Sequence, residues 1–518
     1  MAKARHRWGT RLGIIMAVAG SAVGLGNFLR FPVQAASNGG GAFLIPYFIS
    51  LFLLGVPLMW VEWTLGRYGG GYGHGTAPGI FHTMWQKNRF IKYFGVIGIF
   101  GPLVIFIYYT YVESWTLAYS FFAITGKYAA ANTESAMSSF LSGFQGLEKN
   151  RYFSGMGQAY VFFLITFIAN IAVIYYGIKG GIEKLCKVAM PLLFICGIIL
   201  MVRVLSLGTP DPIKPSWNIG NGLGFMWNPD FSALASAKVW LAAAGQVLFT
   251  LSVGIGVILT YASYLSKGDD VVLSGLSAVS MNEFAEVILG GCIIIPAAFI
   301  FFGPDRIGAV ASSGAFNLGF VTMPLIFQKM AMGAFFGCVW FLLLFLAGIT
   351  SSVSLAQPAV AFLEDEFNIT RPKAVAIFGI VSFILCQPAI FFLGKGVVNE
   401  LDFWGGTFCL VLFATIEVIL FAWVFGMNNA WEEIHRGADM RVPLIFKFII
   451  KYVTPVFLLV ILGSWFIQEG IPTIIMKNMP AANRPFVFAV RALLVGIFAA
   501  LAILVKVAWT KKRMAKNT

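Results

Sequence analysis

Charged residues are scarce in this chain of 518 residues. Only 11% of the residues are Asp, Glu, Lys or Arg, whereas 59% are hydrophobic. Soluble domains carry about 25% charged residues, so the composition excludes a soluble protein and indicates one that crosses a membrane repeatedly. The formal charge is +14, but the basic residues fall in short gaps between apolar runs and form no basic-aromatic module. This placement excludes nucleic acid as a partner.

Cysteine and histidine are also rare, with six and four residues. No two cysteines form a CxxC pair, and all six lie in or beside apolar runs. This pattern excludes a disulfide framework and a zinc site, and it predicts buried free thiols. The histidines are scattered, and no nucleophile–base pair or metal cluster recurs within the apolar runs. We therefore expect a protein that is not an enzyme.

Long apolar runs dominate what is present. About twelve of them are long enough to cross a hydrocarbon core of roughly 30 Å as helices. They lie near 12–36, 41–70, 90–124, 158–178, 186–206, 237–266, 272–302, 333–365, 371–392, 397–424, 443–468 and 484–508. The sequence predicts an all-α integral membrane protein with about twelve transmembrane helices and a single domain over residues 1–518. Membrane lipid is then its immediate environment.

Basic clusters in the gaps predict the orientation in the membrane. If about twelve spans alternate, these clusters all fall on one side, which marks that side as cytoplasmic. They include Lys3, Arg5, Arg7, Arg11, Lys87, Arg89, Lys92, Lys179, Lys184, Lys187, Lys267, Arg371, Lys373, Arg436, Arg441, Lys511, Lys512 and Arg513. We expect a multi-pass protein of the cell membrane (plasma or inner) with both termini in the cytoplasm. Longer loops near 125–157, 207–236 and 303–332 would face the other side.

Two of the apolar runs carry a pair of glycines near the middle. The first run contains Val23-Gly24-Leu25-Gly26, and the sixth contains Val253-Gly254-Ile255-Gly256. Glycine costs a helix interior roughly 1 kcal/mol relative to alanine, so both helices are predicted to open halfway across the membrane. One such pair alone would favour close helix packing. Two at corresponding places favour paired broken helices around a binding site.

An opened helix presents backbone groups that lack helical partners. Its free carbonyl groups suit cations, and the N–H groups at the start of the second half-helix suit an anion. A site that offers both would accept an amino acid zwitterion together with sodium ions. The chemistry of the break therefore predicts a receptor for a small amino acid and Na⁺.

Further motifs extend along nearly the whole chain. They are the run Arg11–Pro32, Gly39-Gly40-Gly41-Ala42-Phe43, Ile107-Tyr108-Tyr109, Phe249-Thr250-Leu251-Ser252, Asn282-Glu283, Gly348-Ile349-Thr350-Ser351-Ser352 and Leu401-Asp402-Phe403-Trp404. In these motifs the chain closely resembles the neurotransmitter:sodium symporter family. The resemblance implies the LeuT fold, with inverted five-helix repeats at 12–206 and 237–424, two additional spans in 443–508, and broken first and sixth helices. It also implies a sodium-coupled symporter that imports neutral, apolar amino acids by alternating access.

The resemblance implies two sodium sites. The first would combine the carbonyl of Ala22 with the side chains of Asn27, Thr250 and Asn282, completed by the substrate carboxylate. The second would combine the carbonyls of Gly20, Val23 and Ala347 with Thr350 and Ser351. Without the family, the hydroxyls of Thr350-Ser351-Ser352 favour hydrogen bonds back to their own helix instead.

A substrate site between the broken helices is also implied. The substrate carboxylate would meet the N–H groups of Leu25 and Gly26 and the Tyr108 hydroxyl. The ammonium would meet the carbonyls of Ala22, Phe249 and Thr250 and the Ser252 hydroxyl. The side-chain pocket would consist of Val104, Tyr108, Phe249, Ile255, Ser351 and Leu355. Ser21, Ile255 and Leu355 depart from a leucine-carrying bacterial member, and this leaves the preferred amino acid open.

Gly24 and several charged residues carry further implications. Monoamine carriers of the family have an aspartate at the position of Gly24, so glycine favours an amino acid substrate. Arg30 and Asp402 would form an outer gate. Arg5 and Asp365, with Ser263 and Tyr264, would form an inner one. Chloride-dependent members have a serine at the position of Glu286, so a carboxylate there implies no chloride requirement and a candidate proton site.

Other functions remain to be weighed against symport. A cation channel would favour rings of charge or repeated filters, and neither is present. A sodium-dependent transporter of another small zwitterion and an amino-acid-sensing receptor without turnover both stay open. Stoichiometry and oligomeric state are not determined by the sequence.

Overall fold

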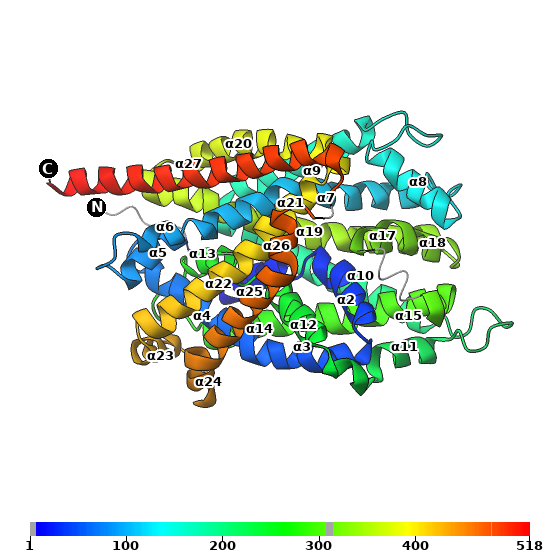
Figure 1. Ribbon diagram of the computed structural model, residues 1–518, viewed down its shortest axis with the longest axis horizontal. Coiled ribbons are helices and arrows are strands. Elements are labelled where there is room, and N and C mark those ends of the chain that lie inside the picture. The colour runs from blue at the N-terminus through cyan, green and yellow to red at the C-terminus, as the bar shows by residue number, and fades with distance from the viewer. Residues whose placement is uncertain (1–6, 307–313, 478, 518) are drawn as a thin grey trace.

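The computed structural model describes residues 7–306, 314–477 and 479–517, and over those residues it contains helices and no β-strand. Most of the long helices run side by side along the longest axis of the molecule (Figure 1). Ten helical segments are long and apolar enough to cross a membrane. They are Gly41–Gly70, Ile91–Thr125, Gly157–Tyr175, Ile178–Leu205, Val272–Phe302, Gly333–Phe367, Arg371–Phe391, Val397–Val424, Ile445–Ile474 and Ala481–Lys511. Each overlaps an apolar run predicted from the sequence.

Each of these segments contains one to three α-helices. In chain order they hold α3 (Leu44–Ser50) and α4 (Val56–Gly70); α6 (Ile91–Phe94) and α7 (Ile97–Thr125); α9 (Gly157–Tyr175); α10 (Glu183–Leu205); α14 (Val272–Glu283) and α15 (Gly291–Phe302); α19 (Gly333–Phe367); α20 (Arg371–Phe391); α21 (Val397–Leu401) and α22 (Cys409–Ile419); α24 (Ile445–Phe448), α25 (Thr454–Trp465) and α26 (Ile471–Ile474); and α27 (Arg484–Asn517). Short π-helical turns, such as Leu51–Gly55 between α3 and α4, join several of these neighbouring helices. The spans therefore stay continuous across the junctions.

The other two expected spans are the broken helices. Helix α1 (Arg11–Ala22) ends at Val23, and the chain resumes as Gly26–Ser37, which includes α2 (Phe31–Ser37), at an angle of 43°. Helices α12 (Ala237–Thr250) and α13 (Val257–Ala262) are separated by a non-helical stretch. With these two, the structure agrees with about twelve spans. It also confirms that both glycine-bearing helices open at their centres.

Backbone geometry explains why the second break contains glycines. Gly254 and Gly256 have φ angles of +75° and +90°, a region that L side chains rarely adopt. A Cβ at Gly254 would lie 2.5 Å from the Leu410 carbonyl oxygen, and one at Gly256 would lie 2.6 Å from the Gly98 carbonyl oxygen. Both the turn and the close approach of α7 and α22 thus require a residue without a side chain.

The bundle has an inner and an outer layer. Helix α1 packs against α10, α13, α14 and α19, and α7 packs against α19, so these segments form the centre. Outer helices expose large apolar side chains: Ile168 on α9, Ile380 on α20 and Val495 on α27 are 65%, 64% and 70% exposed. Apolar surface of that kind is stable against lipid rather than water.

Short helices cover the two ends of the bundle. The beginning of the described chain and the last turns of α27 lie at the left end in Figure 1, together with α5 (Ala77–Met84) and α23 (Met427–His435). We call this the terminal end. At the opposite end lie α8 (Glu134–Phe144), α11 (Ile219–Trp227), α17 (Ala315–Asn317) and α18 (Met323–Gln328). The three long predicted loops therefore contain helices of their own, and they gather at one end.

Candidate functional site

A small cavity lies where the two broken helices face each other. It has a volume of about 50 Å³, and the residues that line it come from both breaks, from α7 and from α19. They are Ser21, Ala22, Gly24, Leu25, Gly26, Asn27, Ile105, Tyr109, Phe249, Thr250, Ser252, Ile255, Ser351, Ser354 and Leu355. The cavity thus combines backbone polar groups, hydroxyls and apolar side chains.

The two breaks are joined by hydrogen bonds from serine hydroxyls. Ser252 has a φ of +53°, which is strained for a residue with a side chain. Its hydroxyl donates to the Ser21 carbonyl at 2.8 Å, across the gap between α12 and α1. Ser351 on α19 donates to the carbonyls of Gly20 and Ser21, both at 3.2 Å. The last turn of α1 is therefore held open by contacts to two other spans.

Three of the predicted ligands of the first sodium site form one buried cluster. The Asn27 amide donates to the Thr250 hydroxyl at 3.0 Å and to the Asn282 side-chain oxygen at 2.8 Å. The Asn282 amide donates to the Thr250 hydroxyl at 3.1 Å. All three side chains are almost fully buried. The fold thus brings amide and hydroxyl oxygens from three segments together beside the cavity, next to Ala22.

Glu286 contacts this cluster directly. Its carboxylate accepts hydrogen bonds from Asn27 at 3.0 Å, from Gln246 at 2.9 Å and from the Thr250 hydroxyl. The residue has no exposure. A carboxyl group in this position places a negative charge, or a proton that cancels it, beside oxygens suited to bind a cation.

The predicted residues of the second sodium site also meet. Ser351 donates to the Gly20 carbonyl, and a Cβ built on Gly20 would lie 3.1 Å from the Thr350 Cβ. The Thr350 hydroxyl donates to the carbonyls of Leu346 and Ala347 at 2.9 and 3.2 Å, which is the back-bonding expected without the family. Its oxygen lone pairs stay free for a cation. Val23 and Ala347 are fully buried in the same region.

The cavity corrects two predicted pocket residues. Val104 and Tyr108 do not line it; Ile105 and Tyr109 do. The Leu25 N–H donates to the Tyr109 hydroxyl at 3.2 Å, whereas the Tyr108 hydroxyl donates to Asp402 at 2.5 Å. Successive residues of a helix point about 100° apart, so a shift of one position turns the predicted face of α7 away from the cavity. The other predicted pocket residues all line it.

The outer gate residues lie near each other without direct contact. The Arg30 guanidinium lies 4.2 Å from the centre of the Phe249 ring, a cation–π arrangement that covers the cavity. Among the described residues no ion pair joins Arg30 to Asp402, and the Asp402 carboxylate accepts from the Tyr108 hydroxyl. The outer gate of Arg30 and Asp402 stays a prediction.

The terminal end of the site is closed by aromatic and polar contacts. Trp8 packs edge-on against Tyr261 at 5.3 Å and donates to its carbonyl at 2.9 Å. Gln357 donates to the Tyr264 hydroxyl at 2.8 Å. Ser263, directly after α13, donates to the Thr260 carbonyl at 2.6 Å. Of the predicted inner gate, Arg5 lies outside the described residues.

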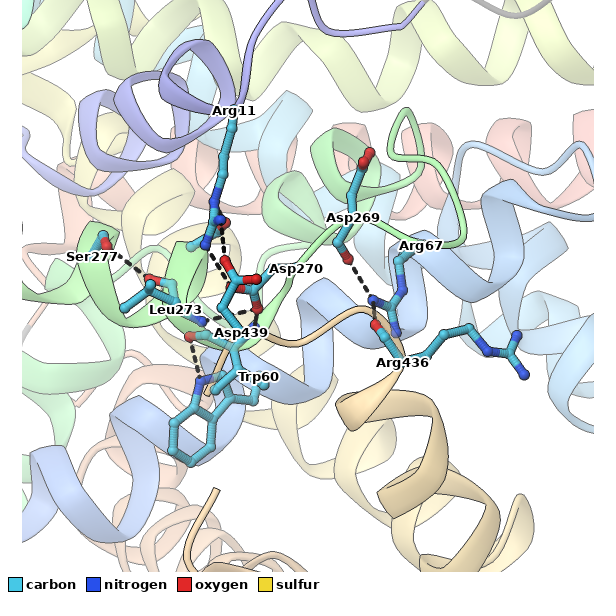
Figure 2. Close-up of polar contacts among 11 residues, drawn as sticks. Arg11, Trp60, Arg67, Asp269, Asp270, Leu273, Ser277, Arg436 and Asp439 are labelled. Atoms are coloured by element: carbon cyan, nitrogen blue, oxygen red, sulfur yellow. Dashed lines mark hydrogen bonds and ion pairs between the residues drawn. The ribbon is translucent and has the colours of Figure 1, made fainter. Parts of the chain in front are cut away.

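A second polar network ties α1 to its surroundings at this end (Figure 2). Arg11 bonds Asp270 and Asp439, both at 2.5 Å. Asp270 also accepts the N–H groups of Val272 and Leu273 at the start of α14, at 2.7 and 3.1 Å. The buried Arg67 nearby donates to the carbonyls of Asp269 and Arg436, both at 2.6 Å. The first half of the broken helix is thus fixed to the loops beside it.

Three buried glutamates lie further from the cavity. Glu62 accepts the Gly254 N–H at 2.5 Å, as expected for a group freed by the break. Glu417 is fully buried, and within the described part of the chain neither carboxyl oxygen has a hydrogen-bond partner. Glu113 accepts from Asn170 at 3.2 Å, and Asn170 in turn accepts from Ser352 at 2.5 Å. Glu113 therefore supports the α19 segment that carries Thr350 and Ser351.

Comparison with known proteins agrees with this geometry. The model of the sodium:neurotransmitter symporter family matches residues 5–140 and 127–512. An uncharacterised sodium-dependent transporter of Methanocaldococcus jannaschii is 30% identical over 458 residues, which cover 88% of this chain and 89% of that protein. A sodium-dependent nutrient amino acid transporter of Drosophila erecta is 27% identical over 513 residues, covering 88% and 77%. The fold is similar to the crystal structure of MhsT in complex with L-phenylalanine, with a TM-score of 0.76 and 30% sequence identity. The match covers 89% of this chain and 100% of the MhsT chain.

Proposed function

The chain belongs to the sodium:neurotransmitter symporter family, whose members are secondary transporters and not enzymes, and from that membership we propose that it imports neutral, apolar amino acids together with sodium. The observation that carries the proposal is the buried cluster of Asn27, Thr250 and Asn282 beside the cavity between the broken helices. A hard cation and an amino acid zwitterion can occupy these two places side by side.

The substrate would lie between backbone N–H groups on one side and backbone carbonyl groups on the other. Its carboxylate would approach the start of the half-helix at Leu25 and Gly26 and the Tyr109 hydroxyl, where the helix dipole favours negative charge. Its ammonium would approach the carbonyls of Ala22, Phe249 and Thr250 and the Ser252 oxygen. A Cβ at Gly24 would lie 3.0 Å from the Ser351 hydroxyl and 3.1 Å from the Tyr109 hydroxyl. An aspartate would fit there only if these two side chains shifted, and that crowding supports an amino acid over a monoamine.

The walls of the cavity support an uncharged side chain. Ile105, Phe249, Ile255 and Leu355 line it, and no Asp, Glu, Lys or Arg does so among the described residues. A charged substrate side chain would lose its hydration here without a partner, which costs several kcal/mol.

We further propose two sodium ions and no chloride. The first ion would bind at Ala22, Asn27, Thr250, Asn282 and the substrate carboxylate. The second would bind at Gly20, Val23, Ala347, Thr350 and Ser351. Glu286 supports the absence of a chloride requirement, because its carboxylate touches Asn27 and Thr250 of the first site. It can supply the negative charge that chloride would otherwise bring.

Transport would proceed by alternating access in a cell membrane with both termini in the cytoplasm. An even number of spans is supported by Figure 1, where the beginning of the described chain and the last turns of α27 lie at the same end of the bundle. The terminal end would then be the cytoplasmic one, closed by Trp8, Tyr261 and Arg11. Repeats over 12–206 and 237–424 would provide the moving and static parts.

Sodium-driven uptake in proteoliposomes tests this function. A panel of radiolabelled amino acids should accumulate under an inward sodium gradient and not under potassium. Asn27→Ala and Asn282→Ala should each raise the sodium concentration for half-maximal uptake at least tenfold. The exposed Asn429, which donates to the Phe425 carbonyl far from the cluster, provides a matched control as Asn429→Ala. Binding without accumulation would show a sensor instead, and unchanged sodium activation in both variants would refute the first site.

A further inference from the structure

The start of α1 is bonded to one carboxylate on α10. The Gly9 N–H donates to Glu183 at 2.7 Å, and the Thr10 hydroxyl donates to it at 3.1 Å. Thr10 is the N-cap of α1 and accepts from the Gly13 N–H at 3.0 Å, so its own proton is available for Glu183. Lys187, one turn later in α10, adds an ion pair at 2.6 Å. Glu183 thus ties together the first turns of two helices that lie far apart in the sequence.

The charge of Glu183 suits this place. The N-terminus of a helix carries unpaired N–H groups and a partial positive charge, which favour an anion. The first turn of α1 contains Arg11 and no acidic residue, so its negative partner comes from α10. Glu183 is only 2% exposed. Hydrogen bonds to a carboxylate in such surroundings are stronger than those between neutral groups in water.

Gly13 allows α1 to approach this carboxylate closely. An added Cβ would lie 2.3 Å from the Glu183 Oε1 and 2.4 Å from its Cδ. Two turns further along, Gly20 of α1 faces Cys186 of α10, whose Sγ would lie 3.4 Å from an added Cβ. Cys186 has no exposure. The first half of α1 is therefore packed against α10 at both Gly13 and Gly20.

The contacts of the same segment with α14 are more exposed. A cleft of about 370 Å³ lies there, and Thr10, Arg11, Asp270 and Asp439 are among the residues that line it. Arg11 reaches both aspartates (Figure 2), but the side chains of Arg11 and Asp439 are 44% and 59% exposed. Ion pairs with such exposure contribute little. The buried contact with Glu183 is therefore a firmer attachment than the Arg11 pairs.

We propose that Glu183 is a positioning residue that holds the first half of α1 against α10, and that it thereby sets how readily the terminal end of the transporter opens. This rests on the proposed function. The break after Ala22 allows the first half of α1 to move without the second. Gly20 belongs to the proposed second sodium site, so separation of α1 from α10 would open that site. Loss of the Glu183 contact should favour the open arrangement.

Alkylation of the native Cys186 measures this separation. The purified protein in detergent, in potassium medium without sodium, is treated with N-ethylmaleimide, and the rate at each cysteine is followed by peptide mass spectrometry. Cys386 on α20 is also fully buried and provides the internal control for general loosening. The rate follows the fraction of molecules that are open. We expect Glu183→Ala to raise the Cys186 rate about tenfold or more and to leave the Cys386 rate within about threefold of the wild type.

Three further variants separate the contact from its surroundings. Gly13→Ala displaces the Glu183 carboxylate by the added Cβ, although alanine favours the helix itself, so it should raise the Cys186 rate by a similar factor. Lys187→Met removes the ion pair within α10 and leaves both hydrogen bonds from α1, so the rate should stay within about threefold of the wild type. The exposed Glu432 on α23, at the same end of the bundle, provides the matched control as Glu432→Ala.

The outcomes distinguish this proposal from the function on which it rests. A Cys186 rate within threefold of the wild type in Glu183→Ala, or in Gly13→Ala if the first variant does not fold, would overturn the role of Glu183. An equal rise at Cys386, or a tenfold rise in Lys187→Met, would overturn it as well. Sodium-driven uptake by the wild type is measured separately. Its absence beside the expected alkylation pattern would refute the proposed function and leave the positioning role of Glu183 in place.

Discussion

At the scale of single residues, Glu286 is the position where we expect one side chain to set the ion requirement. Its carboxylate receives hydrogen bonds from Asn27, Gln246 and Thr250. A negative charge in contact with two proposed sodium ligands attracts the ion strongly, because the distance is short and the surroundings have a low dielectric constant. Replacing that one carboxylate should therefore change which ions are needed and leave the rest of the site in place.

We predict that Glu286→Ser makes uptake depend on chloride. The serine removes the fixed charge and opens space for an anion beside Asn27 and Thr250. Sodium-driven uptake should be the same in chloride and in gluconate for the wild type, and should fall at least tenfold in gluconate for the variant. Glu286→Gln, which keeps the volume but not the charge, serves as the matched comparison and should be weak in both media. Strict chloride dependence of the wild type would contradict the prediction.

At the scale of elements, the breaks in the two helices are stabilised by contacts from their neighbours. Glu62 on α4 binds the Gly254 N–H, and Ser252 binds the carbonyl of Ser21. Unwound backbone within a membrane needs such partners, because each unpaired group would cost several kcal/mol. The break between α12 and α13 is therefore a property of the assembled bundle as well as of its glycines.

Two glycines in the same span should respond in opposite ways to alanine. Gly254→Ala places a Cβ 2.5 Å from the Leu410 carbonyl oxygen at a φ of +75°, which we expect to cost on the order of 1–3 kcal/mol. Gly245 lies within α12 with no atom within 4 Å of its would-be Cβ, so Gly245→Ala should gain about 1 kcal/mol or less. Thermal unfolding in detergent should show a lower midpoint for the first and an equal or higher one for the second. Uptake should be lost only in Gly254→Ala. Equal midpoints would contradict the assigned backbone strain.

At the scale of the whole molecule, the net charge of the proposed cargo determines how strongly the membrane potential drives uptake. Two sodium ions with a zwitterion carry two positive charges inward, and each charge is worth about 2.3 kcal/mol per 100 mV. The same bundle surrounds this cargo with apolar helices, so the charges would cross the membrane inside the protein. The membrane potential should therefore drive accumulation directly.

Imposed diffusion potentials measure the number of charges. An inside-negative step of about 60 mV should raise the limiting accumulation ratio roughly a hundredfold if two charges move, and roughly tenfold if outward proton movement through Glu286 cancels one. Valinomycin with potassium gradients in proteoliposomes provides the step. Accumulation that is insensitive to voltage would contradict sodium symport with a zwitterion.

The sequence by itself determined the spans and the two breaks, and the family resemblance implied the cluster at Asn27, Thr250 and Asn282. Apolar length sets the number of crossings, glycine pairs weaken helices locally, and polar residues within apolar runs must find partners. The motifs that carry the family resemblance then placed most of the pocket. Most predicted bounds of the spans differ from those in the structure by a few residues; the fifth span, predicted to start at 186, starts at Ile178.

Only the tertiary structure decided which face of α7 meets the cavity and which hydroxyls bond each other. Val104 and Tyr108 form one stripe four residues apart, and Ile105 and Tyr109 form the next, so the tyrosine pair by itself cannot say which is inside. Rotation of a helix about its axis is set by packing against its neighbours. The Ser21–Ser354 contact joins residues 333 positions apart, and no local pattern encodes such a distance.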